Sequence, residues 1–207
     1  VLTPRQDSGF TGNGTANTGA IFTGEDKDDN LLGATELFTE VCSVTLCSTL
    51  PVWSGAAALI TARGLMGGAG TSNSALASAG TDGTTRTCTE EYDGTSWSAG
   101  GSVPIALREA MGGGSQNAAY ITGGATNDNG SGIQSESFNY DGSAWSSTGD
   151  MITARRLMTS CTGTQNAGIV FGGETNPTGG SPSNKTEEYN GSSWSAGGAL
   201  STSGRRA

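Results

Sequence analysis

The sequence contains no histidine. Histidine is the commonest general base near neutral pH and the commonest protein ligand of zinc and copper. Its absence excludes a Ser-His-Asp hydrolase and leaves a zinc hydrolase or a copper oxidase without its usual ligands. We therefore expect no metal site, no cofactor and no catalytic centre of these kinds.

Basic residues and long apolar runs are also scarce. The chain has 10 Lys and Arg against 19 Asp and Glu, a formal net charge of −9, so it would repel a nucleic-acid backbone. No apolar run approaches the roughly 20 residues needed to cross a bilayer, and the first residues do not form a signal peptide. We expect neither a nucleic-acid nor a membrane partner, and a soluble or processed chain.

Apolar residues make up only 33% of the chain and 35 residues are glycine, a composition that by itself favours disorder. A repeat overturns that interpretation. Tyrosine, Asp-Gly or Asn-Gly, and tryptophan recur with tryptophan five residues after tyrosine. A stretched copy runs from Phe38 to Trp53. The short copies contribute Tyr92 and Trp97, Tyr140 and Trp145, and Tyr189 and Trp194.

A second motif is an arginine followed by small and apolar residues. It divides the chain into four repeats of about 5–62, 63–107, 108–154 and 155–204. Each repeat holds four short segments separated by turn residues, and its Asx-Gly pair suits a tight hairpin. Four antiparallel strands in about 47 residues are the unit of a β-propeller blade. The sequence predicts one all-β domain over 1–207, a propeller built of four-stranded antiparallel blades.

The repeat resembles the kelch repeat. The resemblance lies in the doublets Gly123-Gly124 and Gly172-Gly173 after an apolar strand, then tyrosine, tryptophan, and Pro or Ala before Arg. It implies that Arg63–Met66 begins the inner strand of its repeat. In the following repeat it implies that the second, third and outer strands are 118–122, 136–140 and 143–146. The spacing from tyrosine to tryptophan is one residue shorter than in kelch, and the second repeat lacks the doublet. Four blades could close a small ring or belong to one of six or seven.

The sequence motif "YDGTSWSAGG … ALREAMGGG … NAAYITGG" is also similar to repeats in predicted tail-fibre and other virion proteins of marine bacteriophages. This resemblance implies a non-enzymatic structural protein of the virion. Its partners would be other virion subunits, in a homo-oligomer, and host cell-surface polysaccharide. The alternatives are a cellular kelch-type protein-interaction module and a sugar-active enzyme.

The repeated arginines Arg63, Arg108 and Arg155, with Arg5 and Arg205 at the ends, have two interpretations. An arginine fork in each blade could hold carboxylates or sugars. An acidic residue also precedes each aromatic, so a structural Arg–Glu pair within each blade is simpler. The acidic residues are Glu36, Glu90 or Glu91, Glu136, and Glu187 or Glu188.

The repeats differ mainly in loops, which carry function more often than the scaffold does. These are the insert 39–51 and the segments 125–133 and 174–185. Their candidate ligand-binding residues are Asn127, Asp128, Asn129, Thr175 and Asn176. The loops have hydrogen-bonding groups but no aromatic on which a sugar could stack, so we expect weak, multivalent contact.

Three other motifs fail in detail. The turn 93–97 is one residue too short for the Asp motif of sialidases, and no isolated carboxylate pair serves glycoside cleavage. The segment 26–30 lacks the glycine and glutamate of an EF-hand and reads as a solvated acidic loop. Cys42 and Cys47 form one close pair rather than the two of a zinc site, so a hairpin disulfide or free thiols are expected.

Overall fold

The computed structural model describes residues 9–10, 18–25, 31–39, 52–129, 131–178 and 181–205, with side chains from Gly55 onward. Within these residues 45% lie in strands and none lies in a helix. Accordingly, the described part of the chain has no helix able to span a bilayer.

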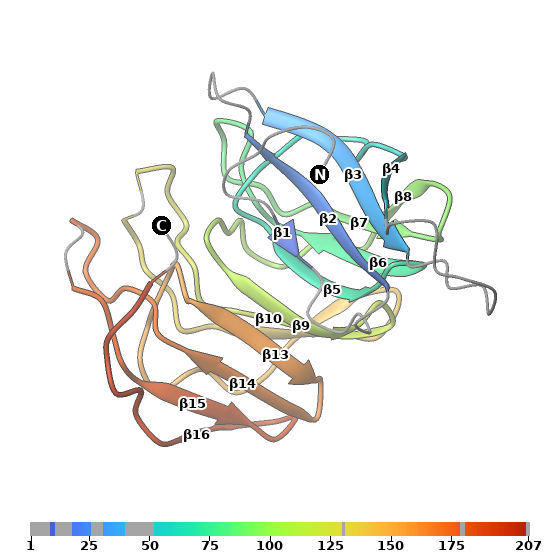
Figure 1. Cartoon of the computed structure of the whole chain (residues 1–207). Helices are drawn as coiled ribbons and strands as arrows, with labels where there is room; N and C mark the ends of the chain where they lie inside the picture. Colours follow the sequence, from blue (N-terminus) through green and yellow to red (C-terminus); the bar gives the residue numbers. More distant parts are fainter. Residues whose placement is uncertain are drawn as a thin grey trace.

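The strands form four antiparallel sheets, one for each repeat (Figure 1). Blade 1 contains β1 (Gly9–Phe10), β2 (Thr18–Glu25), β3 (Leu31–Thr39) and β4 (Val52–Ala56). Blade 2 contains β5 (Gly67–Thr71), β6 (Ser74–Ser78), β7 (Thr89–Tyr92) and β8 (Trp97–Gly100). Blade 3 contains β9 (Met111–Ser115), β10 (Ala118–Thr122), β11 (Ser137–Tyr140) and β12 (Trp145–Ser147). Blade 4 contains β13 (Ser160–Thr164), β14 (Ala167–Phe171), β15 (Thr186–Tyr189) and β16 (Trp194–Ala196). The all-β, propeller-like fold predicted from the repeat is confirmed.

Strand boundaries follow the expectation except at turns. In blade 3 the second strand is as predicted, and the third begins one residue later, at Ser137. The outer strand begins at Trp145 rather than at Ser143, because Ser143 belongs to the turn closed by Asp141. In blade 2 the inner strand begins at Gly67, after the arginine motif.

The innermost strands β1, β5, β9 and β13 lie beside one another in chain order. Glycine makes this close approach possible. A Cβ on Gly112 of β9 would lie 3.0 Å from the carbonyl oxygen of Gly68 on β5. The high glycine content is therefore a packing requirement at the centre of the fold rather than a sign of disorder.

Each blade places its tyrosine directly opposite its tryptophan on the two outer strands. Tyr92 pairs with Trp97 and Tyr140 with Trp145, and their ring centroids are 5.0 and 4.9 Å apart. The Tyr189–Trp194 pair is stacked at 4.8 Å. The three tryptophans occupy equivalent positions, as predicted. In blade 1 the backbone register sets Phe38 opposite Trp53, in agreement with the stretched copy of the motif.

The tryptophans also join the blades. Trp145 Nε1 donates to Thr89 Oγ1 of the preceding blade at 2.9 Å, and Trp194 Nε1 donates to Ser137 Oγ at 3.0 Å. Trp97 Nε1 donates to the carbonyl oxygen of Ala57 at 3.2 Å. Each indole is therefore buried against the blade before it, with its one polar group satisfied.

We predict that replacing the tryptophan lowers the free energy of unfolding more than replacing its hydrogen-bond acceptor does. Trp145→Ala removes the indole and should lower the free energy of unfolding by about 3–5 kcal/mol. Thr89→Val leaves the indole in place without its acceptor and should cost about 1 kcal/mol. Urea unfolding measures both, with Ser98→Ala on the exposed side of β8 as the control. Equal losses for the two variants would contradict a mainly apolar contact.

The tight turns between outer strands are held by an Asx side chain. Asp141 Oδ1 accepts from the backbone N–H groups of Ser143 and Ala144 at 2.9 and 2.8 Å. Asn190 makes the same bonds in blade 4. These bonds, led by the one from Ala144, hold the pKa of Asp141 below its usual value. In blade 2 the pKa of Asp93 is also lowered. The hydrogen bond from the Thr95 hydroxyl contributes most, and the backbone N–H groups of Ser96 and Thr95 add to it.

A lowered carboxyl pKa predicts an acid-dependent stability. The contribution of Asp141 is present above the pKa of its unfolded state, about 3.9, and is lost as the pH falls through the lower folded pKa. Asp141→Asn should therefore melt below the parent at pH 7, with the difference in Tm shrinking as the pH approaches 2. Asn190→Asp should show the reverse. A difference in Tm that stays constant with pH would argue against this account.

Candidate functional site

Arg63 and Arg155 are buried ion-pair partners within their blades. Arg63 pairs closely with Glu90, and Arg155 Nη2 lies 2.8 Å from Glu187 Oε1. Both arginine side chains are fully buried. Burial lowers the pKa of Arg155, and Glu187 opposes that shift.

The glutamates of these pairs also fix the connection between blades. Glu90 accepts from the N–H groups of Ile60 and Thr61 at 2.7 and 3.2 Å. Glu187 accepts from those of Ile152 and Thr153 at the same distances. The Nη atoms of both arginines also bond to carbonyl oxygens inside the fold, while Arg155 Nε has no partner among the described residues. Neither arginine therefore presents an open fork to a ligand.

Arg108 does not occupy the corresponding position in blade 3. Its N–H donates to the carbonyl oxygen of Ala125 at 3.0 Å, as that of Arg156 does to Glu174 and that of Gly64 to Thr81. Arg108 is therefore equivalent to Arg156, and Leu107 takes the place of Arg63 and Arg155. The sequence alignment on arginine was one residue out of register, and no Arg108–Glu136 ion pair is present. The cause is that alignment on arginine matches both Arg and Met of TARGLM and ALREAM, whereas the register in the structure matches only Ala62 with Ala106.

Blade 3 replaces the buried ion pair with apolar groups. Leu107 and Phe138 stand where blades 2 and 4 have arginine and glutamate, and both are buried in one apolar cluster. Pro104, which has no N–H, stands where the Ile60 N–H needs an acceptor. A buried ion pair and a well-packed apolar pair are often similar in stability, so either solution can hold the connection.

We predict that the apolar residues of blade 3 can replace the buried ion pair of blade 2. Arg63→Leu alone leaves Glu90 buried without its charged partner and should cost about 3–5 kcal/mol. The triple variant Ile60→Pro, Arg63→Leu, Glu90→Phe should recover most of that loss, because it leaves no unpaired charge and removes the Ile60 N–H. Only the Thr61 N–H loses its bond to Glu90. Chemical denaturation of the single and triple variants is the measurement. A triple variant less stable than the single one would show that the two blades are not interchangeable here.

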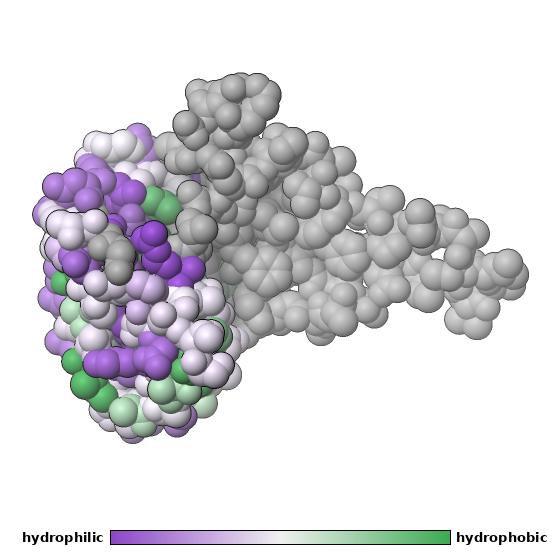
Figure 2. Space-filling view, turned by 60° about the vertical axis from the view of Figure 1, so that its left-hand side comes forward, coloured by the Kyte–Doolittle hydropathy of each residue, from purple (hydrophilic) through white to green (hydrophobic). Residues whose placement is uncertain are grey.

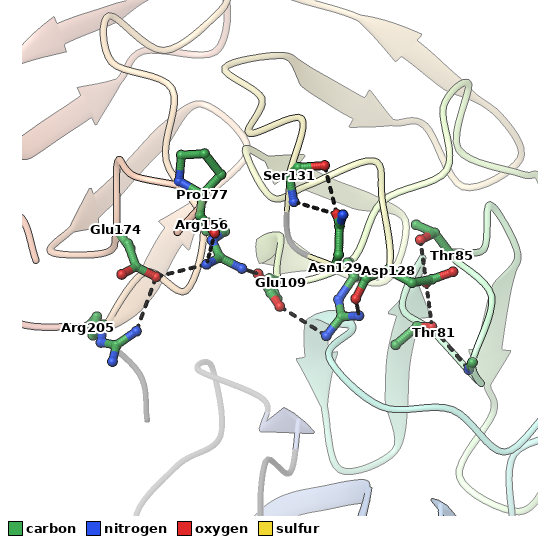
Figure 3. A network of polar contacts seen from close by, with 12 residues as sticks. Thr81, Thr85, Glu109, Asp128, Asn129, Ser131, Arg156, Glu174, Pro177 and Arg205 are labelled. Atoms are coloured by element: carbon green, nitrogen blue, oxygen red, sulfur yellow. Dashed lines mark hydrogen bonds and ion pairs between the residues drawn. The ribbon is translucent and has the colours of Figure 1, made fainter. Parts of the chain in front are cut away.

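A second arginine set forms a continuous ion-pair network (Figure 3). Arg108 Nη2 lies 3.1 Å from Glu109 Oε1, and Glu109 Oε2 lies 2.8 Å from Arg156 Nη1. Glu174 Oε2 lies 3.1 Å from both Arg156 Nη2 and Arg205 Nη1. We call these five residues the arginine network. It has three guanidinium and two carboxylate groups and so is locally basic in an acidic protein.

The network lies where the blades converge. Glu109 donates its N–H to the Leu65 carbonyl oxygen at 2.9 Å and accepts from the Leu157 N–H at 3.2 Å. All three residues have a positive φ, between 47° and 59°. This strained backbone occurs at the same point of each connection, just before an inner strand, and it places the Glu109 side chain between two blades.

The variable loops meet the network at this end. Arg108 Nη1 donates to the carbonyl oxygen of Asp128, and Arg156 Nη2 donates to that of Pro177 at 3.3 Å. Asp128 Oδ1 accepts from the hydroxyls of Thr81 and Thr85 in the preceding blade at 3.1 and 2.7 Å. The loops after β6, β10 and β14 are therefore tied together, with Arg205 the most exposed network member at 44%.

The loop residues singled out from the sequence lie at this end, but several are engaged within their own loops. Asn129 Oδ1 accepts from the Ser131 N–H and hydroxyl at 3.0 and 2.7 Å. Asn127 Nδ2 donates to the Ser131 hydroxyl, and Asn176 closes a similar turn with Thr178. Thr175 is exposed. The backbone of these loops is thus shaped by hydrogen bonds of its own asparagines.

The network residues Glu109, Arg156 and Glu174 were missed from the sequence. One usable signal was the second arginine of Arg155-Arg156, and another was Glu174 directly after a glycine doublet. Glu174 is fully buried, and its Oε1 has no hydrogen-bond partner among the described residues. The network offers guanidinium donors and carboxylate acceptors, which suits hydrogen bonding of hydroxyl groups.

Other candidates lie outside the described residues or take no part in this site. Arg5, the acidic segment 26–30, Cys42 and Cys47 are outside. Cys161 is buried, which raises the pKa of its thiol to about 12, and its Sγ lies 3.2 Å from the Tyr120 hydroxyl. In the described ranges no three His, Cys, Asp or Glu residues are grouped to hold a metal ion.

Comparison with known proteins identifies the fold alone. No protein-family model matches the chain, and no curated protein sequence matches it. Among solved structures, the one titled "Structure of YjhT" is similar with a TM-score of 0.74 at 14% sequence identity. The match covers 98% of this chain and 68% of that one.

Proposed function

We propose that the protein is a non-enzymatic structural protein of a bacteriophage virion, a kelch-like propeller in a tail fibre or surface appendage. Its loop-bearing end binds host cell-surface glycan when several copies are displayed together. The observation that carries the proposal is that the variable loops 125–133 and 174–185, together with the loop after β6, meet the arginine network at one end of the blades.

The chemistry of this end supports contact with hydroxyl-rich ligands. Exposed Thr175, Asn127 and Asn129 present small polar groups, and Arg205 adds a partly exposed guanidinium. The visible surface around the last blades is largely polar, with only small separate apolar areas (Figure 2). Such a surface can bond sugar hydroxyls but provides no stacking platform in these loops, so each contact is weak and affinity comes from multivalency.

The same features favour binding over catalysis. The two glutamates of the network are each held between arginines, an arrangement that fixes their side chains. Retaining and inverting glycosidases instead need one carboxylic acid that donates a proton and a second carboxylate across the scissile bond. The rigid, hydrogen-bonded loops serve a recognition surface better than a reaction site.

Glycan-array binding of the chain displayed on a tetrameric support tests this proposal. We expect binding to a subset of glycans, at least tenfold weaker for the undisplayed monomer, and no release of reducing sugar. Deleting 127–132 should abolish binding while the chain stays folded, because the Ala125–Ile133 bridge closes the base of that loop. Thr164→Ala, at the opposite end of the blades, is the matched control and should bind normally.

Two outcomes would overturn the proposal. Release of reducing sugar would make the protein an enzyme. If the folded deletion variant binds as the parent does, the loop-bearing end is not the glycan surface. In phage carrying the deletion, normal adsorption with failed particle assembly would assign the loops to contact with neighbouring virion subunits instead.

A further inference from the structure

The boundary between blades 2 and 3 and the boundary between blades 3 and 4 use the same docking contacts. A Cβ on Gly101 of blade 2 would lie 2.2 Å from the Ser143 carbonyl oxygen in the turn of blade 3. A Cβ on Gly149 of blade 3 would lie 2.3 Å from that of Ser192. At these two boundaries only glycine fits where the turn of the following blade rests. Between blades 1 and 2 the equivalent residue is Ala57, whose carbonyl oxygen accepts from Trp97 Nε1.

Two further residues complete this docking surface on the earlier blade. A hydroxyl on the third strand accepts the incoming indole N–H, as Thr89 and Ser137 do. An apolar residue two positions after the glycine packs in the same cluster as the incoming tryptophan. Val103 does so for Trp145 and Met151 for Trp194, with exposures of 2% and 4%.

Blade 4 carries the same three groups, of which the glycine and the apolar residue are uncovered, while Thr186 is 7% exposed against 1% for Thr89 and Ser137. Thr186 corresponds to Thr89 and Ser137, and Gly198 corresponds to Gly101 and Gly149. Leu200 corresponds to Val103 and Met151, because its N–H bonds to Asn184 as theirs bond to Thr87 and Ser135. No described atom lies within 4 Å of a Cβ built on Gly198, and Leu200 is only partly buried.

A cavity lies at the position of the incoming indole. It has a volume of about 180 Å³, and Thr186, Ala196, Gly197 and Ala199 are among its lining residues. Blade 4 lies at one end of the row of described blades (Figure 1), and no described blade follows it. The cavity is therefore a socket of the kind that Trp145 and Trp194 fill on blades 2 and 3.

The backbone after blade 4 already follows the path of a blade connection. Gly173 N–H donates to the Gly204 carbonyl oxygen at 2.7 Å. The equivalent glycines Gly80 and Gly124 donate to Leu107 and Arg155, the residues that lead into blades 3 and 4, at 2.7 and 2.8 Å. Residues 204–205 therefore lie where the chain enters a following blade.

A second copy of the chain is a poorer occupant. Its Trp97, Trp145 and Trp194 are already docked on the blades before them. Its remaining tryptophan, Trp53, follows the long connection 40–51 instead of the four-residue turn that rests on the glycine. The socket fits a short Asx-Gly turn with tryptophan five residues after tyrosine.

We propose that the outer face of blade 4 is the docking surface for a fifth repeat of the short-turn type, supplied in cis as blades 2, 3 and 4 are. Its tryptophan fills the cavity and donates to the Thr186 hydroxyl. Its turn rests on Gly198, whose N–H then donates to a turn carbonyl, as Gly149 N–H does to Ser192 at 3.0 Å.

Appending a second copy of residues 157–205 after Arg205 tests the proposal, with amide hydrogen exchange of Gly198 measured by NMR. The exchange should slow at least tenfold relative to the parent chain, toward the rate of Gly149. The same extension with its added tryptophan replaced by alanine is the matched control and should leave Gly198 exchange fast. Gly198→Val should leave the parent chain as stable as before and prevent docking of the added repeat.

An added repeat that stays unfolded, or that folds without slowing Gly198 exchange, would overturn the proposal. So would a concentration-dependent dimer of the parent chain that Gly198→Val abolishes, because the face would then take a second copy. Slowed exchange that depends on the added tryptophan would support it.

Discussion

The contact of each tryptophan with the preceding blade is the interaction on which the rest of the structure depends. A single blade has too few aliphatic residues to bury a core of its own, so its stability comes from its neighbours. The indole of Trp145 or Trp194 supplies the apolar area, and its N–H is satisfied by a hydroxyl of the neighbouring sheet. Gly101 and Gly149 on the receiving blades follow from this contact, because the turns that carry Trp145 and Trp194 rest on bare backbone there.

The connection between blades is held in two chemically different ways. Blades 2 and 4 bury an arginine and a glutamate that also satisfies two backbone N–H groups. Blade 3 uses Leu107 and Phe138 and removes one N–H with Pro104. The constraint is therefore on shape and on satisfied polar groups, and not on charge. For this reason a repeated arginine was a poor guide to a binding site.

The end at which the variable loops meet was only partly predictable. The sequence identified the loops correctly as the places where the repeats differ. It did not show that Asp128 bonds to hydroxyls of the preceding blade, or that Arg108, Glu109, Arg156 and Glu174 form one network with Arg205. The links from Glu109 to Arg156 and from Asp128 to Thr81 and Thr85 join residues of different repeats, and no spacing within a repeat encodes them. The proposed recognition surface therefore depends on how the blades sit side by side.

The sequence alone determined the blade. Local signals suffice for it: alternating strands, Asx-Gly turns, and a tyrosine and tryptophan that must face each other across a hairpin five residues long. The tertiary structure decided the register of the arginine motif and the pairing of charges between blades. It also decided which surface of each blade is covered. These features depend on hydrogen bonds and close contacts between residues about one repeat apart, such as Gly149 with Ser192, which only the assembled sheets bring together.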